Sequence, residues 1–163
     1  MKTAASPLVV LAAAVAFAVA ACGGGSSPTA APTPAQSAAP SSPATGAITL
    51  TVGTAASAGK YLEGRNGLAL YVFLKDTGTT SACYDACAAA WPPLLETDAA
   101  KVTAGNGVSG TLGTTVRTDG TTQVTYNGAP LYYFANDKAA GDTNGEGLQS
   151  VWYVAAPIAS GGY

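Results

Sequence analysis

An internal repeat constrains the fold of this chain more than any other feature. The segment at 66–76 returns at 127–137, and the offset is 61 residues (132 − 71). Both copies carry Asn-Gly, then Leu-Tyr-x-Phe, then Asp, and the same offset places Trp91 on Trp152 without a gap. We therefore divide the folded part into repeat 1, about 60–98, and repeat 2, about 121–159.

Each repeat predicts a turn, a strand and a Trp-bearing segment. Asn-Gly before an apolar run is a strong hairpin signal, so we expect 60–62 to pair with 68–74, and 123–126 with 131–134. Further strands are expected at 48–52, 115–118 and 151–155, and one helix at 82–90, where Pro92 stops it. The fold class is mainly β: a single small domain over 47–160, built from two tandem β-hairpin-based repeats with one short helix.

The first residues predict export. Leu8 to Ala21 form an apolar run of 14 residues, too short for a membrane span of about 20 residues but typical of a secretory signal, so 1–21 reads as a signal peptide. The run ends Val19-Ala20-Ala21-Cys22, which resembles the lipobox of bacterial lipoproteins. That resemblance implies cleavage before Cys22 and acylation of its sulfur by chains such as palmitate. The alternative is a plain secreted protein in which Cys22 is incidental.

Residues 22–46 after the cleavage point predict a disordered tether. Three glycines are followed by Ser, Ala, Thr, Gln and five prolines, with no charge or aromatic ring before Ile48. Such a segment cannot bury enough apolar surface to offset its ordering entropy. The expected partner is the lipid bilayer, reached through acylated Cys22. The expected location is the extracytoplasmic face of the cell membrane, in a periplasm or at a cell surface.

Composition excludes several classes of function. The formal net charge is −2, and removal of Lys2 would make it 6 − 9 = −3, with no basic cluster. Nucleic acid is therefore not an expected partner. The chain contains no histidine, which removes Ser-His-Asp and Cys-His catalysis and His-ligated zinc.

The repeated pattern also resembles a known family. Tyr71, Phe73 and Asp76, like Tyr132, Phe134 and Asp137, are similar to the predicted bacterial lipoproteins with a Tyr-x-(Phe, Trp or Tyr)-x-x-Asp motif, the secreted repeat of unknown function. The segments between the copies share this similarity: Cys83-x-x-x-Cys87-x-x-x-Trp91, Arg117-x-Asp119-Gly120 and Gln123 to Tyr126. The resemblance runs from about 60 to 157 and implies an exported, duplicated domain with no assigned activity.

Cys83 and Cys87 are expected to form a disulfide, since paired cysteines of exported proteins usually bridge. On a helix, residues four apart share a face at a Cα separation that a disulfide tolerates. One interpretation is a local staple, because the equivalent loop of repeat 2 has no cysteine. The other is a redox-active pair, although the spacing is not the C-x-x-C of thioredoxin-like enzymes.

Asp142, Asn144 and Glu146 alternate as in the first half of a calcium loop. Gly147 fits position six, but Tyr153 stands where a bidentate Glu is required, so a calcium site here would be weak. Asp, Asn and Gly are also the residues of ordinary turns. No other cofactor is expected.

Two further interpretations concern the repeated residues. The repeat could bring Asp76 and Asp137 together as an acid–base dyad, or each could simply cap a turn. The repeated Tyr and Phe, with Trp91 and Trp152, predict a core. Other tyrosines could form an exposed binding patch: Tyr84, Tyr126, Tyr133 and Tyr153.

We expect a non-enzymatic envelope module that binds an unknown ligand or protein, with thiol-disulfide or electron-transfer chemistry at Cys83 and Cys87 as the alternative.

Overall fold

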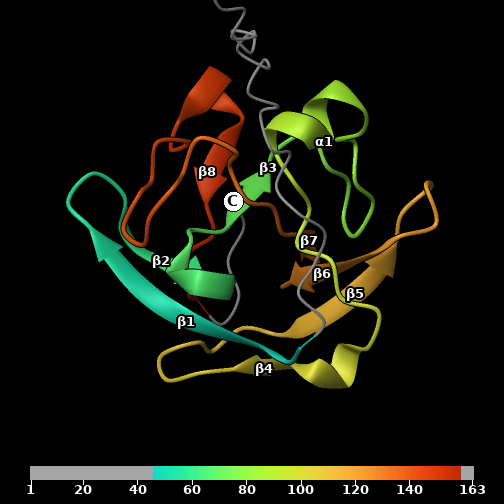
Figure 1. The fold of residues 1–163 in the computed structure, drawn as a ribbon, viewed down its shortest axis with the longest axis horizontal. Helices are drawn as coiled ribbons and strands as arrows, with labels where there is room; N and C mark the ends of the chain where they lie inside the picture. Colours follow the sequence, from blue (N-terminus) through green and yellow to red (C-terminus); the bar gives the residue numbers. More distant parts are fainter. Residues whose placement is uncertain (1–45, 159–163) are drawn as a thin grey trace, which may run out of the picture. The chain divides into compact units, whose positions relative to one another are not determined.

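A computed structural model of the chain describes residues 46–158 (Figure 1). All of them belong to one compact unit. The predicted signal peptide, Cys22 and the tether up to residue 45 lie outside the described residues. Within 46–158, none of the helices has the length and apolar character needed to cross a bilayer.

The described residues are mainly β, as the sequence predicts. The strands are β1 (Ile48–Ala55), β2 (Gly59–Glu63), β3 (Tyr71–Phe73), β4 (Val102–Ala104), β5 (Leu112–Val116), β6 (Thr122–Tyr126), β7 (Ala129–Pro130) and β8 (Trp152–Val154). The single α-helix is α1 (Ala86–Ala90), and 3-10 turns cover η1 (Arg65–Gly67), η2 (Ala99–Lys101) and η3 (Leu148–Ser150). Strand β4 had no counterpart among the predicted strands, and β5 begins earlier than the predicted strand at 115–118.

Each repeat opens with an antiparallel hairpin. Strand β1 pairs with β2 in a register that sets Val52 opposite Leu62, and β5 pairs with β6 so that Thr114 lies opposite Val124. Figure 1 shows the two hairpins on opposite sides of β3, with β4 running beneath them. β4 pairs parallel with β1 and so begins the connection from one hairpin to the next. The repeats therefore start at β1 and β5, before the limits that the motif alone predicts.

The predicted pairing of 60–62 with 68–74 is largely wrong. Asn66 and Gly67 do form the expected turn, both at positive φ, but the chain then makes only a Glu63–Ala69 bridge and a Leu70-to-Leu62 hydrogen bond. β3 leaves the hairpin and pairs with β8, at the far end of the sequence. The physical reason is that Tyr71 and Val72 point to opposite faces and both are buried, so this strand needs covering on both sides.

Repeat 2 follows the same course. Asn127 and Gly128 form a positive-φ turn, and β6 then pairs with the short strand β7. Beyond Pro130, residues 132–135 hydrogen-bond with β3 and with the 90–94 segment of repeat 1. The predicted pairing of 123–126 with 131–134 is thus confirmed only at its start.

The helix predicted over 82–90 is confirmed only from Ala86 to Ala90. Two local hydrogen bonds keep its first part extended, because the Ala82 N–H donates to Asp76 and the Cys83 N–H donates to Ser81. Asp85 then turns the chain at φ 50°. Side-chain acceptors for backbone N–H groups compete with helix formation in this way.

Two apolar clusters fill the interior. The first packs the hairpins together and includes Ile48, Leu50, Leu62, Val124 and Leu131. The second is aromatic and is assembled from the repeated motif residues. It lies where β3 and β8 meet, and it holds the residues that both repeats share.

Candidate functional site

The two motif tyrosines form the centre of the aromatic cluster. The Tyr71 N–H donates to the Tyr132 carbonyl at 2.8 Å, and the Tyr132 N–H donates to the Tyr71 carbonyl at 3.0 Å. Equivalent residues of the two repeats thus exchange both backbone hydrogen bonds, which is the pairing expected around a pseudo-twofold axis. The repeats meet here rather than standing side by side as separate units.

The motif side chains also form hydrogen bonds from one repeat to the other. The Tyr71 hydroxyl donates to Asp137 at 2.7 Å, and the Tyr132 hydroxyl donates to Asp76 at 2.7 Å. Each tyrosine therefore binds the aspartate of the other repeat. Among residues 46–158 no hydrogen bond joins the two carboxylates. The two aspartates of the predicted acid–base dyad are present, but they are not hydrogen-bonded to each other.

Each aspartate also holds the loop of its own repeat. Asp76 accepts the Ala82 N–H at 2.7 Å, and Asp137 accepts the backbone and side-chain N–H groups of Asn144 at 3.0 and 3.1 Å. Asp137 is buried and Asp76 half-buried. The turn-capping interpretation fits these contacts, with the tyrosine of the other repeat added to the cap.

The repeated Trp and Phe residues form a stack of four rings. Trp91 and Trp152 lie 3.8 Å apart between ring centroids and are nearly parallel. Phe73 stacks on Trp152 at 4.1 Å, and Phe134 stacks on Trp91 at 4.3 Å. Each phenylalanine again covers the tryptophan of the other repeat, so the structure places these residues in a core.

The motif tyrosines close this stack from its edges. Tyr71 meets Trp91 edge-on at 5.3 Å, and Tyr132 meets Trp152 edge-on at 5.2 Å. Such T-shaped and offset pairs add about 0.5–1.5 kcal/mol each beyond area burial. Gly145 approaches so closely that a Cβ there would lie 2.7 Å from Trp91 and 2.8 Å from Tyr71.

Arg117 is a buried cation that the motif search did not single out as a site. Its side chain is 1% exposed, and its guanidinium donates to Ser81 at 2.9 Å, Gln123 at 2.7 Å and the Cys83 carbonyl at 2.7 Å. Its ion-pair partner is Asp119 at 3.2 Å. The Ser81 and Tyr132 hydroxyl oxygens lie 2.7 Å apart, so Arg117 is linked through Ser81 to the centre of the molecule. The feature of the sequence that could have pointed to this buried cation was the Arg-x-Asp-Gly segment.

The disulfide between Cys83 and Cys87 is confirmed, with Cα atoms 5.2 Å apart. The expectation that both cysteines lie on one helix is wrong, because Cys83 precedes α1. Cys83 is fully buried, whereas Cys87 is half-buried against the aromatic cluster.

The candidate calcium ligands are each engaged within the protein. Asp142 accepts the N–H groups of Lys138 and Ala139, Asn144 donates to Asp137, and Glu146 accepts the Val154 N–H at 2.7 Å. Within the described range 46–158, no three His, Cys, Asp or Glu side chains gather as a metal site would require. The calcium hypothesis stays a prediction.

Tyrosines outside the motif do not gather into one exposed patch. Tyr126 is buried, and Tyr133 is half-buried with its hydroxyl accepting the Arg65 N–H at 2.8 Å. Tyr84 lies under the Arg117 guanidinium at 4.4 Å. Tyr153 alone lines a surface pocket.

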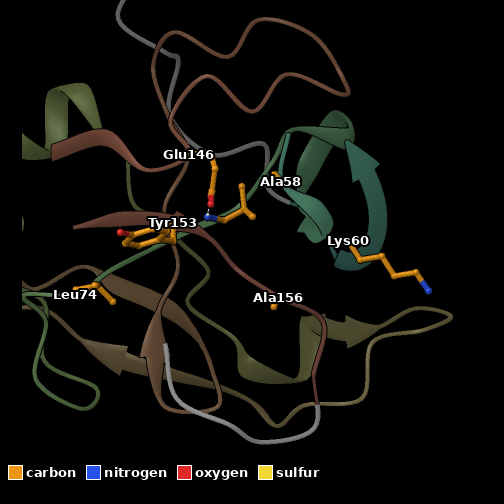
Figure 2. A pocket seen from close by; sticks show the side chains of 7 residues that line it. Ala58, Lys60, Leu74, Glu146, Tyr153 and Ala156 are labelled. Atoms are coloured by element: carbon orange, nitrogen blue, oxygen red, sulfur yellow. Dashed lines mark hydrogen bonds between the residues drawn. The ribbon is translucent and has the colours of Figure 1, made fainter. Parts of the chain in front are cut away.

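That pocket lies where the two repeats meet and has a volume of about 380 Å³. Apolar and polar side chains share its lining: Ala58, Lys60, Leu74, Glu146, Tyr153, Val154 and Ala156. Figure 2 shows Leu74 and Tyr153 on one side and Ala58, Lys60 and Ala156 on the other. The Lys60 side chain extends outward, while Glu146 turns its carboxylate toward β8. The pocket offers an apolar floor with a cation at its rim.

Burial controls the ionisation of the motif tyrosines. Burial is the largest cause of a pKa of Tyr71 far above its usual value near 10, and the hydrogen bond to Asp137 raises it further. Burial also raises the pKa of Tyr132; the bond to Asp76 adds to this, although the contact with Ser81 opposes it. The pKa of Asp76 is raised by burial, against the effects of Ala82, Tyr132 and Arg117. Both motif tyrosines thus keep their phenolic protons to a higher pH than an exposed tyrosine does.

Comparison with known proteins identifies one family. The sequence profile described as a secreted repeat of unknown function matches twice, at 54–95 and at 113–156. The two matches correspond to the two halves seen in the structure. No curated protein and no solved structure matches the chain.

Replacement of Tyr71 by Phe removes the hydroxyl that donates to buried Asp137, so we expect Tyr71→Phe to lower the free energy of unfolding by about 1–3 kcal/mol. Urea unfolding measures this. Tyr153→Phe is the matched control, since no hydrogen bond of its hydroxyl occurs within 46–158, and it should change stability by less than about 0.5 kcal/mol. Equal effects of the two substitutions would contradict the proposed role of the Tyr–Asp pair.

The raised tyrosine pKa values predict a loss of stability in alkali. Below a pH of about 10 both states hold the phenolic protons; as the pH rises further, the unfolded state loses them while the folded state keeps them, so stability falls. Urea unfolding between about pH 8 and about pH 11 should show this decline. The double variant Tyr71→Phe, Tyr132→Phe should give a flatter curve, and an unchanged slope would refute the assignment.

Proposed function

The chain belongs to the family of the secreted repeat of unknown function, and on this premise we propose that it is a lipid-anchored, extracytoplasmic module that binds a ligand or protein of the cell envelope and does not act as an enzyme. The secreted character of the family supports an extracytoplasmic location. The lipid anchor and the binding activity are our proposals.

One observation carries the non-enzymatic part. The polar atoms of the repeated motif bind one another: Tyr71 with Asp137, which is buried, and Tyr132 with Asp76, which is half-buried. Catalytic groups need access to a substrate and a pKa matched to proton transfer near the working pH. Tyrosines with strongly raised pKa values, bonded to these carboxylates, are suited to stability instead.

The binding part rests on the pocket of Figure 2. Its volume of about 380 Å³ falls in the lower part of the range of small-molecule sites, which are mostly apolar with few polar groups. Leu74 at its edge is 44% exposed, although apolar side chains of this size usually gain from burial. One cationic and one anionic side chain, Lys60 and Glu146, line it together with apolar groups. We propose that a partly apolar envelope component binds here.

The anchor part rests on the sequence around Cys22. One acyl chain binds a bilayer only weakly, at about 0.8 kcal/mol per buried CH₂, whereas two or more hold a protein stably. The uncharged segment at 22–46 would then separate the domain from the lipid head groups.

A second candidate function is thiol-disulfide exchange or electron transfer at Cys83 and Cys87. The observation that favours it is the unequal burial of the two cysteines, since Cys83 is fully buried and Cys87 is half-buried.

The anchor is tested by Cys22→Ser in the full chain. We expect the variant to leave the membrane fraction and to lack the mass of acyl chains, because no thiol remains to carry them. Cys87→Ser is the control and should stay membrane-bound. Membrane retention of the Cys22→Ser chain would refute lipid anchoring.

Binding at the pocket is tested by a photo-cross-linking residue placed at Leu74 or at Val116 in intact cells. Val116 is 73% exposed, more than Leu74, so non-specific contact would label it more strongly. We expect a discrete cross-linked product from position 74 and none from position 116. The reverse pattern, or equal labelling, would contradict a binding site at this pocket.

A further inference from the structure

The position of Cys83 does not depend on the disulfide. Its carbonyl accepts Arg117 at 2.7 Å, and its N–H donates to Ser81 at 3.1 Å. Ser81 is itself held by Tyr132 and Arg117. Cys83 is therefore fixed by the buried polar network, and loss of the bridge would leave it in place.

Helix α1 depends on the disulfide much more. It has five residues, none of them buried, and no side chain caps its N-terminus. A helix of this length is not stable by itself. Asp85, which precedes it, has φ 50° and ψ −121°, a conformation that non-glycine residues rarely adopt. Cys87 packs against the aromatic cluster, whereas the end of the helix is held by a hydrogen bond from the Ala135 N–H to the Ala90 carbonyl at 2.9 Å.

The two sulfurs thus differ in access and in mobility. Cys83 is inaccessible and rigidly placed, while Cys87 is half-buried on a segment with little packing of its own. Thiol-disulfide exchange requires that a thiolate reach one sulfur while the other departs. Cys87 is the more exposed of the two residues in the folded protein and is therefore the candidate for the first condition.

We propose that Cys83–Cys87 is a reducible disulfide whose partner is an exported dithiol protein, which attacks Cys87 and releases Cys83. This rests on the second candidate function above and holds whether or not Cys22 is acylated. The proposal names the attacked sulfur, the leaving group and the chemical class of the partner.

The exchange balances in two steps. A thiolate of the partner attacks the Cys87 sulfur, the bond to Cys83 breaks, and Cys83 leaves as a thiolate that takes up a proton. The second thiol of the partner then attacks the mixed disulfide, so the partner becomes the disulfide and Cys87 becomes a thiol. Two electrons and two protons pass from the partner dithiol to this chain.

Arg117 lies next to Cys83. Its guanidinium donates to the Cys83 carbonyl at 2.7 Å, and its counter-ion Asp119 has a side chain 45% exposed. A neighbouring arginine stabilises a cysteine thiolate, and a more stable leaving thiolate leaves faster.

Native-state reduction of the full chain tests whether the pair is redox-active. Dithiothreitol is the probe, without denaturant, and alkylation with mass spectrometry counts the thiols. We expect the rate to rise in proportion to dithiothreitol, and amides of 87–91 to lose hydrogen-exchange protection while those of Tyr71 and Tyr132 keep it. A rate that levels off at that of global unfolding would show a staple and overturn both this inference and the second candidate function.

Single-cysteine variants test which sulfur is attacked. Glutathione disulfide should modify Cys87 in the Cys83→Ser chain at least about tenfold faster than it modifies Cys83 in the Cys87→Ser chain. Equal rates, with native-state reduction still observed, would overturn the assignment of Cys87 but leave the redox function standing. If either variant fails to fold, the wild-type mixed disulfide with glutathione, trapped by acid and mapped by digestion, decides the same point: an adduct on Cys83 overturns the assignment.

Discussion

The hydrogen bond from each motif tyrosine to the aspartate of the other repeat is the contact on which the rest of the structure depends. It places Tyr71 and Tyr132 back to back, and this fixes the strands that carry them. Those strands set Trp91 and Trp152 into one stack and leave each phenylalanine over the tryptophan of the other repeat. Since the Tyr–Asp bonds, the Phe–Trp stacks and the Trp–Trp stack cross between repeats, one repeat alone would expose a strand edge and half of an aromatic stack. Each repeat thus completes the core of the other.

The sequence predicts the individual elements of this arrangement but not that they pair across the two repeats. The offset of 61 residues, the Asn-Gly turns and the alternation of Tyr and Phe are local patterns, and the structure contains all of them. Which strand β3 joins is decided by burial on both of its faces, a property of the assembled fold that hairpin signals do not carry. The helix was predicted too long for a related reason, because Asp76 and Ser81 accept N–H groups that a helix would use. Local propensity had no means of anticipating those acceptors.

The burial of Arg117 is a property that the sequence motif does not reveal. A buried guanidinium is costly unless its donors are satisfied, and here Ser81, Gln123 and the Cys83 carbonyl satisfy them. Nothing in the spacing of Arg117 and Asp119 reveals that one is buried and the other exposed. The same arginine joins the tyrosine centre to the disulfide loop through Ser81. A change at the disulfide therefore occurs next to a rigid network, which confines its effect to the loop.

The two loops that follow the motif are closed in different ways, and this difference bears on the function of the fold. Both loops are tied to their aspartate, and both lead to a tryptophan. In repeat 1 the loop is closed by a disulfide, whereas in repeat 2 it is closed by Asn144 and by the bond from Val154 to Glu146. The pocket of Figure 2 is lined by residues of both repeats, among them Glu146 of the second loop. A function encoded by the shared motif would be present twice, but the disulfide closes the loop of repeat 1 and not that of repeat 2. Activity is therefore to be sought in what the repeats do not share, and the shared residues are what hold those two differing loops in place.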